Sequence, residues 1–413
     1  MAVISVGLLS GAVIVPFGQA GALSRPGGPA GTTRQVPPPR VIPLIKPAMA
    51  ISGTTAVVIA QSPGSFSSQA YVFDEIGASW HREGALAGLG ATSPVSVALA
   101  DNTLVIGSPY VATGGLAFIY TKSGLTFRRV AVLQGGPHSS GSFGVSVATN
   151  GTDVLVGNPD GTRTGAAYAY RETGSTWRVS QRLVDPVPLT GGHFGSAVAV
   201  SGTTAVVGAA YATGHAFAYT KVGPNWQLSG PLSPTDLPPG AELGESAAVA
   251  GTDVVVGSAA GAYAFQRIPQ GWAQLPFPLQ DGRAQANRPG SFDGFGASVG
   301  VEAAVNGDLA FAVGAPGVPI GTPPPGQVQV FGWSHVASVS RSFTLHLATL
   351  SAPSSMPGDG FGVNVAVSGD TLLVAAQPLL IASEGDGPGI SAEHVYVYRN
   401  TAAGWRPAGE LSL

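Results

Sequence analysis

Histidine and carboxylate side chains are the groups in this chain that could do chemistry, because the sequence contains no cysteine. Without cysteine there are no disulfides, thiolate metal sites or cysteine nucleophiles. The seven histidines form no His-x-His or His-Glu-x-x-His motif, so they show no metal-binding spacing. We expect ordinary surface or strand histidines, and we expect no catalytic serine.

Two histidines nevertheless stand where a ligand could reach them. His193 directly precedes a Phe-Gly pair, and His138 lies five residues before the corresponding Phe143. Both would lie in loops near one face of the molecule, and loops on a rigid scaffold are where binding residues usually occur.

Acidic residues come close together in the sequence at Glu242/Glu245, Asp236/Glu242 and Glu384/Asp386. A glycosidase needs two carboxylates at a set separation across a cleft, and only the tertiary structure decides that separation. We interpret these acids as solvated loop residues.

The composition is that of a weakly charged protein with enough apolar residues for a core. Charged residues make up 10% of the 413 residues, and the formal net charge is −3. This balance indicates no basic face for nucleic acid. The 60 glycines and 34 prolines recur in phase with apolar runs, so we interpret them as turns between short strands.

We predict a signal peptide at residues 1–22, a Pro/Gly-rich linker at 23–47, and a secreted or cell-surface protein. Residues 2–22 are apolar and uncharged and end in Ala20-Gly21-Ala22, a pattern typical of signal peptidase sites. No basic residue precedes Arg25, so an uncleaved N-terminal anchor, the one membrane contact we consider, stays open. Whether residues 41–47 pair with the end of the chain also stays open.

A sequence unit with four marks is repeated seven times between residues 48 and 413. The marks are a Phe-Gly pair, a Gly-Thr/Asp turn, an apolar strand ending in Gly-Ala/Ser-Pro, and an aromatic strand followed by Trp and Leu. The fourth copy shows this order from Phe194-Gly195 to Leu232, whereas the first copy lacks its Phe-Gly. A repeat of this length is one supersecondary unit copied in a ring or a stack.

Each copy predicts four short strands and no helix. The second strand is a continuous apolar run, which suits burial on both faces, and the third alternates large aromatic and small residues. Seven such units around an axis make an all-β fold, a seven-bladed β-propeller with four antiparallel strands per blade. The seam of the ring would lie between blades one and seven.

The spacing between the last aromatic residue and the following leucine predicts how the fourth strand is built. It is six residues in five copies, as from Trp177 to Leu183, and seven in copies five and six. An even spacing places both side chains on one face of a regular strand. We therefore predict a β-bulge in the last strand of copies five and six alone.

The marks resemble those of the FG-GAP family, the propeller repeats of integrin α-subunit heads and of many bacterial exported proteins. Gly314-Ala315-Pro316 matches the Gly-Ala-Pro element fully, and four other copies match it in part. The Phe-Gly element occurs at Phe143-Gly144, Phe194-Gly195, Phe295-Gly296 and Phe361-Gly362. The resemblance extends over residues 48–413 and implies a propeller that binds ligands, and the Trp before the last strand is similar to the bacterial subtype.

The calcium-binding copies of that family carry Asp-x-Asp-x-Asp-Gly loops, and this chain departs from them. Its corresponding loops, such as SGTT and NGTD, offer at most one carboxylate each. Calcium takes six to eight oxygen ligands, several of them carboxylates. We therefore expect no metal and no cofactor.

The candidate binding residues lie in the irregular loops, and we expect no catalytic residue among them. They are Tyr110, His138, Asp160, Arg163, His193, Tyr211, Arg283, Arg288, Asp293 and Asp386.

The resemblance and the lack of a catalytic constellation indicate a non-catalytic extracellular or cell-surface binding or adhesion module. Its partner would be a protein or glycan ligand and not nucleic acid. Two alternatives stay open: a carbohydrate-binding or carbohydrate-active propeller, and a structural component of an envelope assembly. Exposed aromatic platforms would favour the first, and a large apolar patch on the outer rim would favour the second.

Overall fold

The structure is a computed structural model of the 413-residue chain. The residues that it describes are 3–5, 47–61, 67–90, 92–111, 113–135, 142–160, 164–188, 191–210, 214–275, 294–303, 309–317, 325–336, 341–353, 359–377 and 394–413.

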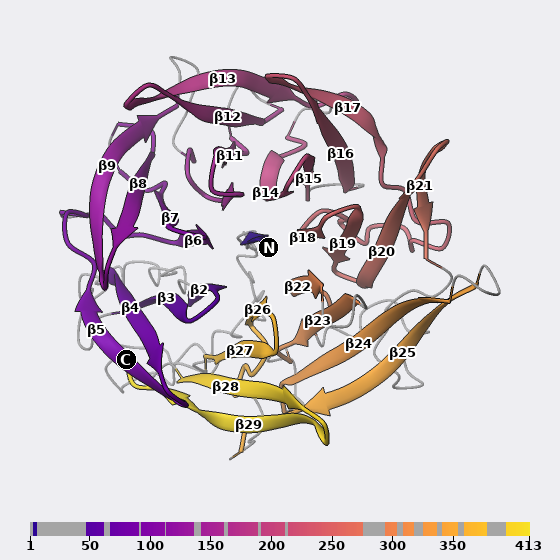
Figure 1. Ribbon diagram of the computed structural model, residues 1–413. Coiled ribbons are helices and arrows are strands. Elements are labelled where there is room, and N and C mark those ends of the chain that lie inside the picture. Colours follow the sequence, from indigo (N-terminus) through magenta and orange to yellow (C-terminus); the bar gives the residue numbers. More distant parts are fainter. Residues whose placement is uncertain are drawn as a thin grey trace, which may run out of the picture.

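Seven antiparallel sheets stand around a common axis, so the predicted seven-bladed β-propeller is confirmed (Figure 1). Each blade runs from the centre outward in chain order, which makes the fourth strand the outer edge. In the described residues no helix has the length and hydrophobicity that a membrane span requires.

The strands of blades one to four follow one another without crossovers. They are β2 (Ala48–Ser52), β3 (Thr55–Gln61), β4 (Ser68–Ile76) and β5 (Ser79–Ala85); β6 (Ser96–Ala100), β7 (Thr103–Ser108), β8 (Leu116–Ser123) and β9 (Thr126–Gln134); β10 (Val147–Thr149), β11 (Asp153–Asn158), β12 (Ala166–Thr173) and β13 (Thr176–Val184); and β14 (Phe194–Ser201), β15 (Thr204–Ala209), β16 (His215–Val222) and β17 (Asn225–Pro231).

Blades five to seven repeat the arrangement. They are built from β18 (Ser246–Ala250), β19 (Asp253–Ser258), β20 (Gly261–Ile268) and β21 (Gly271–Gln274); β22 (Ser298–Ala303), β23 (Leu309–Ala315), β24 (Gln327–Val336) and β25 (Arg341–Leu350); and β26 (Asn364–Ser368), β27 (Thr371–Ala376), β28 (His394–Thr401) and β29 (Gly404–Leu411).

Blade five differs from the prediction by one strand. The short strand β1 (Val3–Ser5) lies in the centre of the ring and pairs antiparallel with β18, where Ile4 is opposite Ala248. The inner strand of a blade leaves one edge unpaired toward the axis, and β1 covers that edge in blade five. Cleavage of the predicted signal peptide would remove this strand.

The two glycine marks of the repeat are the two sides of one contact between neighbouring blades. Gly157 is the last residue but one in the second strand of blade three, and a Cβ there would lie 2.0 Å from the carbonyl oxygen of Gly195 in blade four. Gly195 has a φ of +97°, and a Cβ on it would lie 2.4 Å from the Ala166 oxygen. The blades therefore approach backbone to backbone, which only glycine permits at this distance.

A hydrogen bond accompanies this contact at the five junctions between blade two and blade seven. The hydroxyl of a serine at the start of one blade donates to the carbonyl of the Phe-Gly glycine in the next blade, as Ser146 does to Gly195 at 2.9 Å. The equivalent pairs are Ser96 with Gly144, Ser196 with Gly244, Ser246 with Gly296 and Ser298 with Gly362. These carbonyls are buried, so each bond satisfies an acceptor that would otherwise be costly.

The phenylalanine of the Phe-Gly pair fills the apolar layer of the same junction. Phe143 is fully buried and packs edge to face on Tyr168 and Tyr170 of its own blade, at centroid distances of 5.7 and 6.2 Å. The Tyr170 hydroxyl donates to the Gln134 carbonyl of the preceding blade at 2.9 Å.

The predicted β-bulge is confirmed in blade six, but the described residues of blade five show none, and the five blades that were expected to be regular each have one. The third and fourth strands shift register by one residue in blades one, two, three, four, six and seven. In blade three the shift lies between Ala169 and Tyr170, so Trp177 pairs with Glu172 and Leu183 pairs with Ala167. Glu172 and Ala167 are five positions apart in their strand, so their side chains point to opposite faces. Their partners Trp177 and Leu183 therefore also face opposite sides of the blade.

This geometry lets one outer strand contact both neighbouring blades. Trp177 packs in the core between blades two and three, and Leu183 packs in the core between blades three and four. The bulge therefore distributes the two large side chains between the two junctions of each blade.

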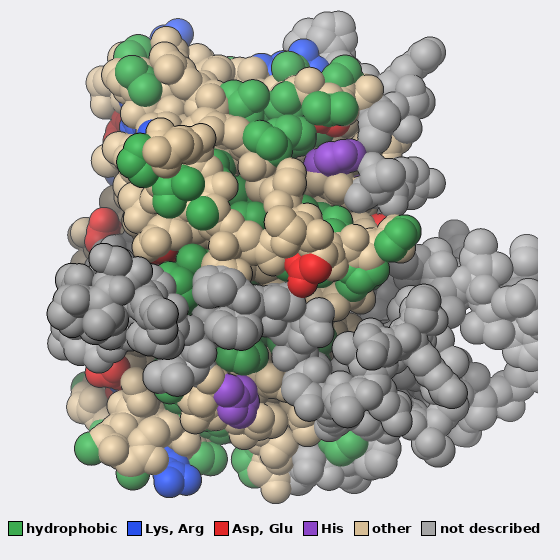
Figure 2. Space-filling model, turned by 90° about the vertical axis from the view of Figure 1, so that its right-hand side faces the viewer, with side chains coloured by type: hydrophobic (Ala, Val, Ile, Leu, Met, Phe, Trp, Pro, Cys, Tyr) green, Lys and Arg blue, Asp and Glu red, His purple; other side chains and the backbone are tan. Residues whose placement is uncertain are grey.

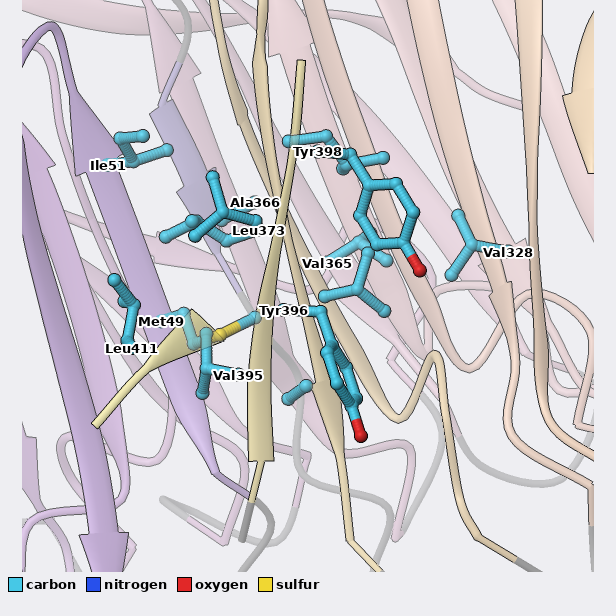
Figure 3. Packing of buried hydrophobic residues seen from close by; sticks show 14 of the residues in the cluster. Met49, Ile51, Val328, Val365, Ala366, Leu373, Val395, Tyr396, Tyr398 and Leu411 are labelled. Atoms are coloured by element: carbon cyan, nitrogen blue, oxygen red, sulfur yellow. The ribbon is translucent and has the colours of Figure 1, made fainter. Parts of the chain in front are cut away.

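The ring closes between blades seven and one through side chains. Met49 and Ile51 of blade one share an apolar cluster with Leu373 and Leu411 of blade seven (Figure 3). The Asn364 amide donates to the Pro47 carbonyl at 2.9 Å, in the place that a serine–glycine bond holds elsewhere. Residues 41–46 lie outside the described residues.

Buried carboxylates on the side of the strand 1–2 turns pair with cations from a neighbouring blade. Lys122 of blade two binds Asp74 of blade one at 2.5 Å, and Lys221 of blade four binds Asp153 of blade three, which also binds Arg171. Across the seam, Arg399 of blade seven binds Glu75 of blade one.

Asp253 of blade five occupies the position of Asp153 but pairs with no cation among the residues that the structure describes. The cation comes from a fixed position near the end of the third strand in the next blade. This position holds Lys122 in blade two and Lys221 in blade four, but Trp333 in blade six. Trp333 is buried, and one Asp253 carboxylate oxygen accepts no hydrogen bond. Burial raises the pKa of Asp253 to about 6, and hydrogen bonds from Gln266 and Thr252 limit the rise.

Gly157→Ala should destabilise the propeller by about 3 kcal/mol, because its methyl group would overlap the backbone of the next blade. Gly202→Ala is the matched control, since nothing lies within 4 Å of a Cβ there, and it should lose only about 1 kcal/mol for its φ of +54°. Urea unfolding measures both variants. Equal losses would show that the junction tolerates a side chain.

Asp253→Asn should stabilise the protein by up to about 3 kcal/mol at pH 7 and leave it unchanged near pH 4. The unfolded state releases the Asp253 proton at a lower pH than the folded state, so the wild type loses stability as the pH rises through this window. Asp153→Asn should instead be destabilising at pH 7, because it leaves Lys221 and Arg171 without their carboxylate. Urea unfolding at both pH values tests the pair, and a stabilising effect of Asp253→Asn that persisted at pH 4 would contradict the assignment.

Candidate functional site

One face of the ring collects the loops that could bind a ligand. Because every blade is a four-stranded antiparallel meander, the segments entering the first strand and the segments leaving the second strand lie on the same face. We call it the loop face. The tight turns between strands one and two and between strands three and four lie on the opposite face.

Asp160, Ser142 and His193 form a polar cluster on the loop face. Asp160 follows β11, Ser142 precedes Phe143, and His193 precedes Phe194. The Ser142 hydroxyl donates to Asp160 Oδ2, and His193 Nε2 lies 4.0 Å from Asp160 Oδ1. The Asp160 side chain is half exposed, so the carboxylate is accessible to a ligand.

Tyr110 extends this cluster toward blade two. It follows a Ser-Pro pair after β7, as Asp160 follows an Asn-Pro pair after β11, so the two residues occupy equivalent positions in neighbouring blades. Tyr110 is 60% exposed. Partial burial and, secondly, the Asp160 carboxylate raise the pKa of the Tyr110 phenol, so the phenol lies within electrostatic reach of this carboxylate.

His193 holds a strained backbone conformation. Its φ is +53°, a region that costs an L-residue other than glycine roughly 1–2 kcal/mol. The equivalent residues before Phe-Gly in blades six and seven are Gly294 and Gly360, with φ of +73° and +62°. Glu242 of blade five is strained in the same way, at +49°. Blades six and seven avoid this strain by using glycine, whereas blade four keeps a histidine. The retained strain indicates that the His193 side chain has a role.

A buried amide lies in the strand that leads to this cluster. Asn158 is fully buried, and neither its Nδ2 nor its Oδ1 has a hydrogen-bond partner. Ser108, its equivalent in blade two, lies 3.4 Å from the Thr92 hydroxyl, and Ser142 is the counterpart of Thr92 in blade three. The repeat therefore directs the Asn158 amide toward the Ser142 side of the cluster.

The cluster has the residue types of a hydrolytic triad but a different connectivity. In a triad the serine hydroxyl gives its proton to histidine, and the acid orients that histidine. Here the Ser142 hydroxyl donates its hydrogen bond to the Asp160 carboxylate and not to the His193 imidazole, so the imidazole does not activate Ser142. The arrangement instead presents a carboxylate, an imidazole and a phenol to a ligand.

A second serine has the sequence spacing of a nucleophile elbow. Gly296-Ala297-Ser298-Val299-Gly300 matches Gly-x-Ser-x-Gly, which marks an exposed serine at a strand-to-helix turn in hydrolases. Ser298 lies instead in β22, is 1% exposed, and donates to the Gly362 carbonyl at 2.9 Å. Its hydroxyl belongs to the junction between blades six and seven.

The structure brings together three of the candidate residues from the sequence, Tyr110, Asp160 and His193. Ser142 was missed; its position directly before a Phe-Gly pair, like that of His193, was the available signal. The other candidates lie outside the described residues: His138, Arg163, Tyr211, Arg283, Arg288, Asp293 and Asp386.

Among the described residues no group of three or more His, Asp or Glu side chains could hold a metal ion. In the strand 1–2 turn of blade three, the Asn150 carboxamide accepts hydrogen bonds from the Thr152 and Asp153 amides at 3.1 and 2.8 Å. This turn is thus closed by its own side chain. The absence of bound calcium stays a prediction.

Comparisons with known proteins agree with the repeat marks. Residues 177–219 match the model of the FG-GAP repeat, from the last strand of blade three through the third strand of blade four. This match and the seven blades support an FG-GAP repeat propeller family. No curated protein matches the chain.

One solved structure with a similar fold is the crystal structure of Kluyvelomyces marxianus Hsv2. It shares 10% sequence identity, with a TM-score of 0.49, over 89% of this chain and 99% of that one.

His193→Gly should raise the stability by about 1 kcal/mol, because glycine adopts the positive φ without strain. A gain would show that the imidazole is retained at a cost to stability. Glu242→Gly is the matched control, since it relieves the same strain away from Asp160 and should give a similar gain. Thermal unfolding of both variants tests this, and a destabilised His193→Gly would assign the imidazole to structure instead.

Proposed function

We propose that this FG-GAP repeat propeller is a non-catalytic binding module, displayed outside the cytoplasm, that engages its ligand on the loop face around Asp160. The observation that carries the proposal is the convergence of Tyr110, Asp160, Ser142 and His193 from three successive blades.

The rigid scaffold supports a binding role for these side chains. Every described junction beneath them is held by buried aromatic residues and by serine-to-carbonyl hydrogen bonds, so the loop residues start from a preorganised base. Preorganisation lowers the entropy that binding costs. Asp160 also keeps a hydrogen-bonding capacity toward solvent, because its side chain is half exposed.

The connectivity of the cluster supports binding rather than turnover. In the usual arrangement an imidazole accepts the proton of a serine nucleophile, whereas the Ser142 hydroxyl donates its hydrogen bond to the Asp160 carboxylate. A bound group would meet an acceptor in Asp160 and an aromatic face in Tyr110.

The N-terminal sequence supports an extracytoplasmic location. Residues 2–22 are apolar and uncharged and end in a small-x-small pattern. A chain without cysteine needs no particular redox environment, which is compatible with export.

A glycan is the second candidate ligand, and Tyr110 favours it. An exposed aromatic ring beside a carboxylate offers an apolar platform and a hydrogen-bond acceptor at the same place. A protein ligand would use the same groups as part of a wider surface.

A glycan and extracellular-matrix array, probed with the chain lacking residues 1–22, tests the proposal. Asp160→Asn should weaken binding to the recognised ligand at least about tenfold, because a charged acceptor contributes roughly 1.5–3 kcal/mol. Asp370→Asn, an exposed acid in a turn on the opposite face, should bind as the wild type does.

Equal loss in both variants, or none in Asp160→Asn, would contradict the assignment of the site. Consumption of any array ligand, followed by mass spectrometry of the spotted glycans, would contradict the non-catalytic role.

A further inference from the structure

The outer strands of blades two and three carry arginine and valine side chains that point to solvent. In β9 these are Arg128, Arg129, Val130 and Val132, and the exposed fractions of the two valines are 43% and 45%. In β13 they are Arg178, Val179, Arg182 and Val184, with 51% and 50% for the valines. The two strands contact each other on the outer wall of the ring (Figure 1), so we treat them as one surface, the β9–β13 rim.

Three of the four arginines of this rim take no part in the ion pairs of the described residues. In the described part of the chain Arg128, Arg129 and Arg178 form no ion pair; the carboxylates Asp74, Asp153 and Glu75 are taken by other cations. Arg129 donates to the Gly88 carbonyl and lies over the Phe118 ring, which leaves its charge in place.

The rim therefore concentrates positive charge in a chain whose net charge is −3. On the side of the ring near β21 the visible basic and acidic side chains are scattered singly over the surface (Figure 2). The composition indicates no basic face, but the fold gathers four arginines on two adjacent strands.

The bulge accounts for the position of one of the four valines. In β9 the register shift between Ile119 and Tyr120 leaves Val130 without a partner on β8, whereas in β13 the equivalent unpaired residue is Ser180. The fourth strand is also the edge of its blade, so its side chains have no further strand to cover them.

We propose that the β9–β13 rim docks on a membrane surface that bears anionic phospholipid headgroups. Guanidinium groups pair bidentately with phosphates, and aliphatic side chains between them gain by entering the interfacial layer. Nucleic acid or a sulfated glycan would match the arginines but would leave the four valines in water. The mixture of the two side-chain types therefore favours lipid.

Co-sedimentation with vesicles tests the rim in the chain lacking residues 1–22, so that the apolar N-terminus does not contribute. The protein should bind vesicles of equal parts phosphatidylcholine and phosphatidylglycerol, and not vesicles of phosphatidylcholine alone. Each arginine near a charged surface is worth about 1 kcal/mol, so Arg128→Gln with Arg178→Gln should reduce partitioning about thirtyfold. Val132→Ser with Val184→Ser should also reduce it.

Two exposed arginines on other blades provide the matched control. Arg267→Gln with Arg406→Gln removes the same charge from blades five and seven and should leave partitioning unchanged. The Asp160→Asn variant should also keep wild-type partitioning, which separates this surface from the loop-face site.

The proposal is overturned if the wild type ignores the anionic vesicles, or if the two arginine pairs weaken binding equally. It is also overturned if heparin binds as tightly as the vesicles and the valine variant binds as the wild type does, because the rim would then be a polyanion site.

Discussion

The structure depends on the close approach of backbones where one blade meets the next. A glycine near the end of the second strand of one blade faces the Phe-Gly glycine of the following blade, and a Cβ on Gly107, Gly157, Gly257 or Gly314 would lie 2.0–2.1 Å from that glycine's oxygen. The same oxygen accepts a buried serine hydroxyl from the preceding blade. Steric fit and hydrogen bonding therefore select the same spacing, and repetition of that spacing produces a ring.

The first blade shows what happens when these residues are absent. It has no Phe-Gly pair, and its junctions use the Pro47 and Pro94 carbonyls, which accept from Asn364 at 2.9 Å and from Ser68 at 2.5 Å. The acceptor is retained although the glycine is lost. Closure of the ring thus depends on satisfying a buried carbonyl at every junction, together with the apolar cluster of blades one and seven.

The two faces of the ring carry different kinds of electrostatics. On the turn side, Asp74 and Asp153 are buried and neutralised by lysines from the next blade, and these pairs lock blade order. On the loop face, Asp160 is half exposed, accepts a hydrogen bond from Ser142 and lies near His193. The position that supplies this cation holds lysine in blades two and four but tryptophan in blade six. Asp253 therefore lacks the lysine that neutralises Asp74 and Asp153.

The sequence by itself determined the fold, since the in-phase glycines, the apolar second strands and the aromatic third strands predict seven four-stranded blades. It also placed Tyr110, Asp160 and His193 in loops of three successive copies. The fourth-strand bulges could not be predicted from spacing, because a one-residue shift is a property of two paired strands and reverses the face of every residue beyond it. Only the tertiary structure decided that Trp177 and Leu183 serve different junctions and that Ser142 joins Asp160. The tertiary structure also showed that the arginines of β9 and β13 form one surface. In all these cases the contacting residues belong to different strands or blades, which are adjacent only in the folded ring.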